Sequence, residues 1–141
     1  MRILICAFTY WPAVDGVQNV TGYQAEGLAA RGHDVTVLTG YLPEKKLPEE
    51  EEHNGVHIRR FAARTETMLH HGDKAAYQRL LKEYAAKVDV IMTVCPESWC
   101  TDWAIPLAGQ LDCAMVMMTH GIHDFRWFTF KDKSMYGVVR K

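Results

Sequence analysis

The chain has 141 residues, of which 48% are hydrophobic, with 16 basic and 17 acidic side chains. Single domains cluster around roughly 100–150 residues, so the chain has room for one domain and excludes a second full one. Its apolar fraction is typical of a globular domain with a core. The formal net charge of -1 provides no field that could hold a polyanion, so we expect no nucleic-acid binding.

No targeting or membrane-spanning signal stands out. Residues 1–6 lead straight into an apolar run and lack the cleavage site of a signal peptide, and no apolar run approaches the roughly 20 residues of a spanning helix. The four cysteines lie in or beside apolar runs without the paired spacing of a zinc ribbon; they are Cys6, Cys95, Cys100 and Cys113. We therefore expect a cytoplasmic protein with buried or half-buried thiols and no metal site.

The first 39 residues predict a strand, a helix and a second strand. Residues 2–8 form an apolar run typical of a strand buried on both faces. A loop leads into a helix that begins at Asp15, which forms a capping-box pattern with Gln18, and ends at Gly32. Residues 34–39 are rich in β-branched side chains and predict the second strand. Together they form a βαβ unit with parallel strands.

A polar, proline-punctuated stretch follows between Gly40 and Gly55. Its four consecutive glutamates, residues 49–52, predict a solvated loop, because like charges repel and cannot be buried unpaired. A third strand, near an edge of the sheet, is expected over residues 56–61. The histidine pair at 70 and 71 lies in a polar stretch and is expected to be exposed to solvent.

The second half alternates helix and strand again. The pattern predicts a helix over 74–88, a strand over 89–95, a helix over 98–111 that Pro106 kinks or ends early, and a strand over 113–119. This order indicates an α/β fold with a Rossmann-like, doubly wound and mostly parallel sheet. Ligands of such sheets bind beyond the carboxyl ends of the strands, so the loops that follow the strands carry the candidate site.

Those loops lack the common cofactor signatures. The loop after the first strand has only Gly16 where a dinucleotide site has three glycines, and the second strand ends without an acidic residue. The phosphate-binding G-x-x-x-x-G-K motif and the G-x-S-x-G nucleophile elbow are absent as well. What remains is the helix N-terminus at Gly16, whose amides and dipole attract phosphate, although every parallel α/β protein has such helix ends.

His120 directly follows the fifth strand. It could form a hydrogen bond with a ligand in the crevice, or it could satisfy a loop carbonyl; both interpretations stay open. A zinc site of His120, His123 and Asp124 is disfavoured, because such spacing requires a helix and Gly121 opposes one. The aromatic and basic segment 125–131 is either a membrane-interface patch or, as we favour, the packed approach to another helix.

Several pieces, taken in order, resemble the N-terminal domain of a GT-B glycosyltransferase. They are most similar to family 4, whose members are retaining enzymes with nucleotide-sugar donors. The matching pieces are the first strand with residues 12–16, and then residues 28–39, 54–60, 89–91 and 119–121.

The resemblance implies that this domain presents the acceptor side, while a second Rossmann-like domain holds most of the nucleotide sugar. Gly16, with Asp15 beside it, would approach the donor diphosphate, and His120 would be the catalytic residue that contacts the transferred sugar. The resemblance also implies that no metal ion or other cofactor is needed. Acceptor contacts would come from Tyr10, Trp11, Gln18 and Thr119.

The chain departs from the family pattern at three points. Asp15 occupies the first of two positions that are usually glycine, so either its carboxylate turns away as the helix cap or the donor contact is altered. Cys95 follows the fourth strand, where the family often has a histidine. The paired glutamates of the family's second domain have no counterpart.

We therefore expect residues 1–141 to form an acceptor-side domain that stops before its last strands, without the C-terminal donor domain and inactive alone. The complete enzyme would transfer sugar from a nucleotide sugar to a glycan, lipid or small-molecule hydroxyl in the cytoplasm, with peripheral contact to the inner membrane face as one option. The alternatives are a stand-alone Rossmann- or flavodoxin-like module that binds a phosphate ligand, and a sugar-nucleotide epimerase of GT-B architecture.

Overall fold

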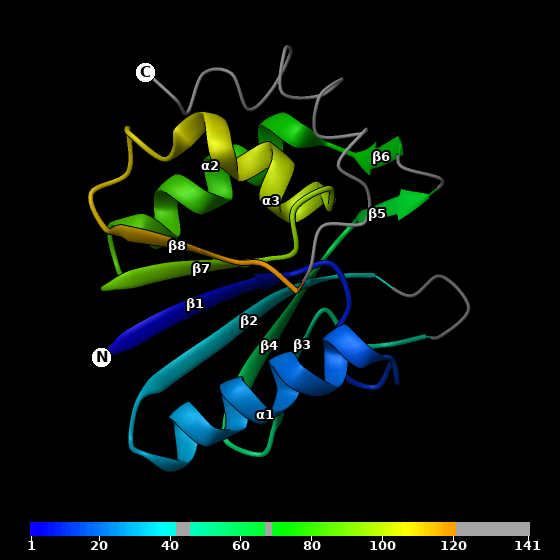
Figure 1. The fold of residues 1–141 in the computed structure, drawn as a ribbon, viewed down its shortest axis with the longest axis vertical. Helices are drawn as coiled ribbons and strands as arrows, with labels where there is room; N and C mark the ends of the chain where they lie inside the picture. Colours follow the sequence, from blue (N-terminus) through cyan, green and yellow to red (C-terminus); the bar gives the residue numbers. More distant parts are fainter. Residues whose placement is uncertain (42–45, 67–68, 121–141) are drawn as a thin grey trace.

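A computed structural model describes residues 1–41, 46–66 and 69–120 of the chain. A six-stranded sheet crosses the molecule in the order β3-β4-β2-β1-β7-β8 (Figure 1). Every neighbouring pair is parallel except β3 and β4. The strands are β1 (Arg2–Ala7), β2 (Asp34–Gly40), β3 (Glu50–His53), β4 (Val56–Phe61), β7 (Val90–Val94) and β8 (Ala114–Met118).

Helices cover both faces of this sheet. Helix α1 (Gly16–Ala30) lies on one face, and α2 (Lys74–Ala85) and α3 (Trp99–Ala104) lie on the other (Figure 1). A short hairpin of β5 (Ala63–Glu66) and β6 (Leu69–Gly72) forms a separate two-stranded sheet. The predicted Rossmann-like, doubly wound and mostly parallel architecture is confirmed.

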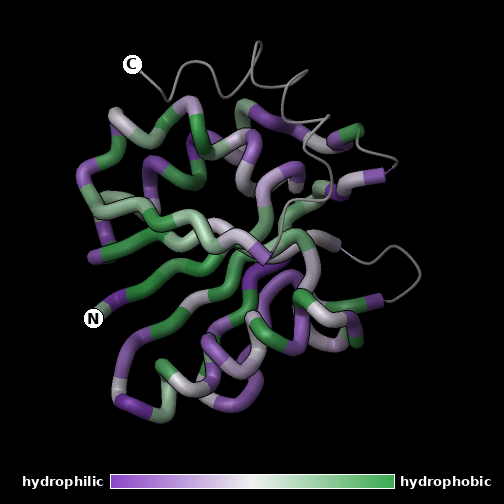
Figure 2. The backbone as a smooth tube through the Cα atoms, in the orientation of Figure 1, coloured by the Kyte–Doolittle hydropathy of each residue, from purple (hydrophilic) through white to green (hydrophobic). Residues whose placement is uncertain are grey.

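Strand β1 is buried on both faces, as its continuous apolar sequence predicts. Ile3 and Ile5 pack in the core layer beneath α1, whereas Leu4 and Cys6 pack with Trp99 beneath α2 and α3. Figure 2 shows the same central strands as the most hydrophobic part of the backbone. Cys6 and Cys100 are fully buried and Cys95 and Cys113 are half-buried, as expected.

Helix boundaries follow the predicted breakers. The segment 98–111 ends as an α-helix at Ala104 and continues as a 3₁₀ turn over Ile105–Leu107, because Pro106 cannot extend the α-helical hydrogen bonding. Helix α2 ends at Ala85, three residues before its predicted end. None of the helices in residues 1–41, 46–66 and 69–120 is long and apolar enough to cross a membrane.

Two expectations are corrected. Most of the glutamate run is not a loop: Glu50–His53 is the edge strand β3, and β4 lies beside it, near the edge of the sheet as expected. The repulsion within the run is offset by ion pairs to β4, of Glu51 with Arg60 and of Glu50 with Arg59. His70 is not solvent-exposed; its side chain is 13% exposed because it is bound to the buried Asp102.

Candidate functional site

The strand order places the topological switch point of the sheet between the carboxyl ends of β1 and β7. From β1 the chain continues through α1 to β2 on one side, whereas β7 and β8 extend the sheet on the other side. In a doubly wound sheet this reversal of direction separates the loops and leaves the ligand crevice. Three segments reach it: the loop 8–15 after β1, the turn 95–98 after β7, and Thr119 with His120 after β8.

Cys95 connects these segments. Its backbone N–H donates to the Met118 carbonyl oxygen at 2.9 Å, which brings the ends of β7 and β8 together. Burial raises the pKa of the Cys95 thiol, a hydrogen bond from the His120 backbone lowers it in part, and the charge of Asp15 raises it. The Cys95 thiol therefore interacts with the His120 backbone through a hydrogen bond and with the charge of Asp15.

Asp15 is the N-cap of α1. Its carboxylate accepts a hydrogen bond from the Gln18 backbone N–H at 2.7 Å, and its carbonyl oxygen accepts one from Asn19 at 3.0 Å. Gly16 begins the helix, and a Cβ added there would meet nothing within 4 Å. The predicted phosphate-binding residues thus sit at an open helix N-terminus, with the Asp15 carboxylate engaged as the cap.

The predicted acceptor residues of the first loop occupy different environments. Tyr10 is 2% exposed and its hydroxyl has no hydrogen-bond partner among the described residues. Burial raises its pKa to about 12, with a smaller contribution from the charge of Glu26. Trp11 is 39% exposed and its ring stacks on His53 at 4.1 Å between centroids. Gln18 lies on α1 and is 8% exposed.

Arg60 holds this loop in place from strand β4. It is 3% exposed, and its guanidinium donates to the carbonyl oxygens of Trp11 at 2.9 Å and Pro48 at 2.8 Å, besides its ion pair with Glu51. A charge-assisted hydrogen bond from a buried cation is stronger than a neutral one. The position of Trp11 is therefore set by a residue 49 positions away, which no local pattern in the sequence indicates.

Thr119 and His120 are both exposed and directly follow the carboxyl end of β8. They are the last two residues that the structure describes. Two other parts of the sequence analysis lie outside the described residues. They are the possible zinc ligands His123 and Asp124, and the aromatic and basic segment 125–131.

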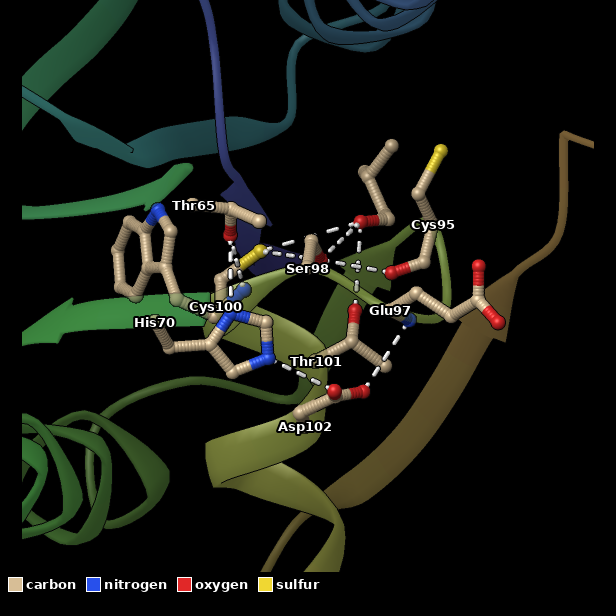
Figure 3. Close-up of polar contacts among 10 residues, drawn as sticks. Thr65, His70, Cys95, Glu97, Ser98, Cys100, Thr101 and Asp102 are labelled. Atoms are coloured by element: carbon tan, nitrogen blue, oxygen red, sulfur yellow. Dashed lines mark hydrogen bonds and ion pairs between the residues drawn. The ribbon is translucent and has the colours of Figure 1, made fainter. Parts of the chain in front are cut away.

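Sequence reasoning missed the organisation of the turn after β7. Cys95 and Glu97 have positive φ values of 62° and 67°, which cost about 1–3 kcal/mol each in a residue with a side chain. The Glu97 N–H donates to the Asp102 carboxylate at 3.1 Å, and the Ser98 hydroxyl donates to the Cys95 carbonyl oxygen at 2.7 Å. These bonds hold the strained turn (Figure 3).

A hydrogen-bonded chain links that turn to the β5–β6 hairpin. The second oxygen of the Asp102 carboxylate lies 2.8 Å from Nε2 of His70, and Nδ1 of His70 lies 3.1 Å from the Thr65 hydroxyl. Thr65 in turn accepts the Trp99 backbone N–H at 3.0 Å, and so caps the start of α3 from another element (Figure 3). Isolated threonine and histidine residues in a polar stretch carry no sequence signal for such a network.

Three comparisons relate the chain to known proteins. A family model described as "Glycosyl transferase 4-like domain" matches residues 15–138. The chain is 39% identical over 51 residues, or 35% of its length, to a protein of Escherichia coli (strain K12) named as a colanic acid biosynthesis glycosyl transferase, WcaI. A sucrose-phosphate synthase from Thermosynechococcus elongatus shares the fold over 99% of this chain, with a TM-score of 0.60 and 20% identity.

These relatives are much longer than the part that they share with this chain. The matched region covers 12% of the E. coli protein and 39% of the sucrose-phosphate synthase chain. The match therefore spans less than half the length of either relative.

Proposed function

Because the chain belongs to the glycosyl transferase 4-like domain family, we propose that it forms the acceptor-side half of a GT-B glycosyltransferase. The complete enzyme transfers a sugar from a nucleotide-sugar donor to the hydroxyl group of an acceptor, with retention of anomeric configuration. The observation that carries the proposal is the convergence of the α1 N-terminus, Cys95 and His120 at one crevice, within a chain of this family.

In this proposal the N-terminus of α1 faces the donor diphosphate. The helix dipole and the amides of its first turn favour a phosphate near Gly16. The Asp15 carboxylate is engaged with the Gln18 amide, which supports the alternative in which Asp15 turns away as the cap. Its negative charge still reduces the positive potential, so we propose that most donor affinity comes from a second Rossmann-like domain.

His120 is proposed to contact the transferred sugar. It is exposed at the end of a parallel strand, where an imidazole can donate to or accept from a sugar hydroxyl. The acceptor enters beside it, along the surface formed by the loop after β1. In this proposal the donor phosphate, the transferred sugar and the acceptor lie along one crevice in the order that transfer requires.

The test is steady-state kinetics of the complete natural protein with nucleotide sugars and saccharide acceptors. We expect nucleoside diphosphate to be released only when an acceptor is present. His120→Ala should lower kcat about 100-fold, because one lost transition-state contact typically costs about 10²–10³ in rate. His71→Ala, an exposed histidine outside the crevice, is the matched control and should leave kcat unchanged.

Other outcomes would support the competing functions. Isomerised nucleotide sugar without transfer would identify an epimerase. Saturable binding of inorganic phosphate by the 141-residue chain, with no turnover of any nucleotide sugar by the complete protein, would identify a binding module. Either result would overturn the proposal.

A further inference from the structure

A concave surface lies along α1, between this helix and the β3–β4 turn. It is a groove of about 260 Å³ that begins at the loop after β1 and continues past the middle of the helix. The stacked rings of Trp11 and His53, inclined by only 8°, form one wall. Tyr23, which is 81% exposed, stands on α1 at the same groove. The groove therefore offers aromatic surface that the fold does not bury.

Gly22 forms the floor of this groove at the middle of α1. A Cβ at this position would meet only Nε2 of Gln18 at 3.6 Å and Oε1 of Glu26 at 3.9 Å, both ordinary contact distances. Packing therefore does not require glycine here, although glycine is among the least favourable residues in a helix interior. The missing side chain deepens the groove instead.

Two polar groups stand on either side of the bare floor. Gln18 and Glu26 precede and follow Gly22 by one helical turn, so their side chains share its face. The second oxygen of Glu26 accepts a hydrogen bond from Asn54 at 3.1 Å, which fixes the carboxylate in place. Gln18 is 92% buried, and no described residue forms a hydrogen bond with its side-chain amide. A donor and an acceptor are thus available to a ligand.

We propose that this groove binds one neutral pyranose ring of a saccharide acceptor, as a subsite that begins at the loop after β1. The inference rests on the proposed function and specifies its acceptor. A pyranose has an apolar C–H face that packs on an aromatic ring and hydroxyl groups that pair with the Gln18 amide and the Glu26 carboxylate. The Trp11 wall is pre-positioned, because Arg60 holds its carbonyl oxygen.

Size and charge argue against a nucleotide at this place. Pockets for drug-sized ligands measure roughly 300–1,000 Å³, so a groove of about 260 Å³ suits one ring. The groove carries the Glu26 carboxylate, and no lysine or arginine is among the described residues that line it. A phosphate would meet repulsion without a compensating cation.

The test uses two alanine variants on the same helix. Gly22→Ala fills the floor, whereas Gly27→Ala adds the same methyl group at a position outside this groove, where nothing lies within 4 Å. Both should raise the thermal midpoint of the 141-residue chain, because alanine is the better helix former. The probes are methyl glucoside, methyl galactoside and methyl mannoside, with uridine monophosphate as the competing class, followed by ¹⁵N–¹H NMR titration.

We expect at least one neutral glycoside to shift the amide signals of residues 18–26 in a saturable manner at millimolar concentration. Gly22→Ala and Trp11→Ala should each raise its Kd at least tenfold, and Gly27→Ala should leave it within twofold. Saturable binding of none of the glycosides, equal effects of the two glycine variants, or uridine monophosphate binding that Gly22→Ala abolishes would each overturn the proposal.

The same variants separate this inference from the proposed function. In the complete protein, Gly22→Ala should raise the acceptor KM, while Gly27→Ala should not. If transfer occurs and Gly22→Ala alters neither saccharide binding nor the acceptor KM, the subsite is wrong and the transferase stands. If the chain binds the glycoside as expected but the complete protein transfers no sugar, the subsite stands and the transferase is wrong.

Discussion

Asp15, which the resemblance puts at a position that is usually glycine, serves as the N-cap of α1. The carboxylate accepts the Gln18 amide and occupies the N-cap of α1. The sequence spacing of Asp15 and Gln18 predicted this cap, because a capping residue is recognised from local pattern alone. A carboxylate at the cap stabilises the helix through the dipole and, for the same reason, competes with a phosphate at that end.

Removing the cap should destabilise the domain. Asp15→Ala is expected to lower the free energy of unfolding by about 1 kcal/mol, because it leaves a first-turn amide without its acceptor. Asp15→Asn retains a side-chain oxygen and should stay close to the wild type. Urea unfolding followed by circular dichroism measures both. An equal loss in the two variants would show that the charge, and not the hydrogen bond, carries the effect.

Because of the buried thiols, the free energy of unfolding should depend on pH in the alkaline range. Burial raises the pKa of Cys100 to about 12 and that of Cys6 further still. Both thiols therefore stay protonated in the folded chain but ionise near their ordinary pKa of about 8.5 in the unfolded chain. Because the folded pKa is raised, their contribution is fully present below about pH 8.5 and is lost as the pH rises toward 12.

Removing one thiol should make the free energy of unfolding less dependent on pH in this range. Each such group contributes a slope of about 1.4 kcal/mol per pH unit between the two pKa values, so Cys100→Ala should reduce the slope above pH 9 by about that amount. The variant will also be less stable at neutral pH, because the packed sulfur is lost. Urea midpoints between pH 7 and 11 test the slope; an unchanged slope would mean that Cys100 ionises in the folded state.

Only some of the residues that line the groove along α1 could be proposed from the sequence. Trp11 and Gln18 were predicted to contact the acceptor, and that assignment remains a prediction. His53 and Asn54 come to the same groove from more than 40 positions away. A contact between such distant residues depends on the register of β3 with β4, which no periodicity in the chain specifies.

At the scale of elements, the parallel strands were predictable and the polar ones were not. A strand buried on both faces carries a largely apolar run, as β1 does after Arg2 and β7 does apart from Thr93, whereas β2 is recognised by its β-branched residues. Strand β3 is made mostly of glutamates, and its stability depends on Arg59 and Arg60 of the neighbouring strand. Tertiary partners of this kind override a local pattern. For this reason the glutamate run was wrongly predicted to be a loop and is a strand instead.

The β5–β6 hairpin is held to α3 by the chain from Thr65 through His70 to Asp102. His70→Ala should lower the free energy of unfolding by about 1–3 kcal/mol, because the buried Asp102 carboxylate loses a hydrogen-bond partner. The Glu97 amide, which donates to the same carboxylate, should then exchange its hydrogen faster. Chemical denaturation and amide hydrogen exchange measure the two effects.

His71 provides the control for this element. Its side chain is 47% exposed and lies 4.0 Å from the Glu66 carboxylate, so His71→Ala should change stability by less than about 0.5 kcal/mol. Equal losses in the two variants would indicate a general effect on the hairpin. Faster exchange of Glu97 in His70→Ala alone would locate the effect in the network that holds the turn after β7.

At the scale of the whole molecule, the alternation of strands and helices was sufficient to predict the fold class and the edge of the sheet where the loops gather. Both follow from general rules of connection and handedness. The orientation of individual side chains at this edge was not predictable. Tyr10, for example, was predicted to contact the acceptor, but its side chain is buried. The chain is thus identified as a glycosyl transferase 4-like domain, and its function is proposed from the loops that gather at this edge of the sheet.

The most direct measurement of that function is the NMR spectrum of the reaction product. The complete natural protein is given a nucleotide sugar together with a saccharide acceptor, and the anomeric proton signals are followed over time. The account predicts a new glycosidic signal with the anomeric configuration of the donor and a matching loss of nucleotide sugar. An unchanged donor, or a donor converted only to its epimer or to free sugar, would contradict it.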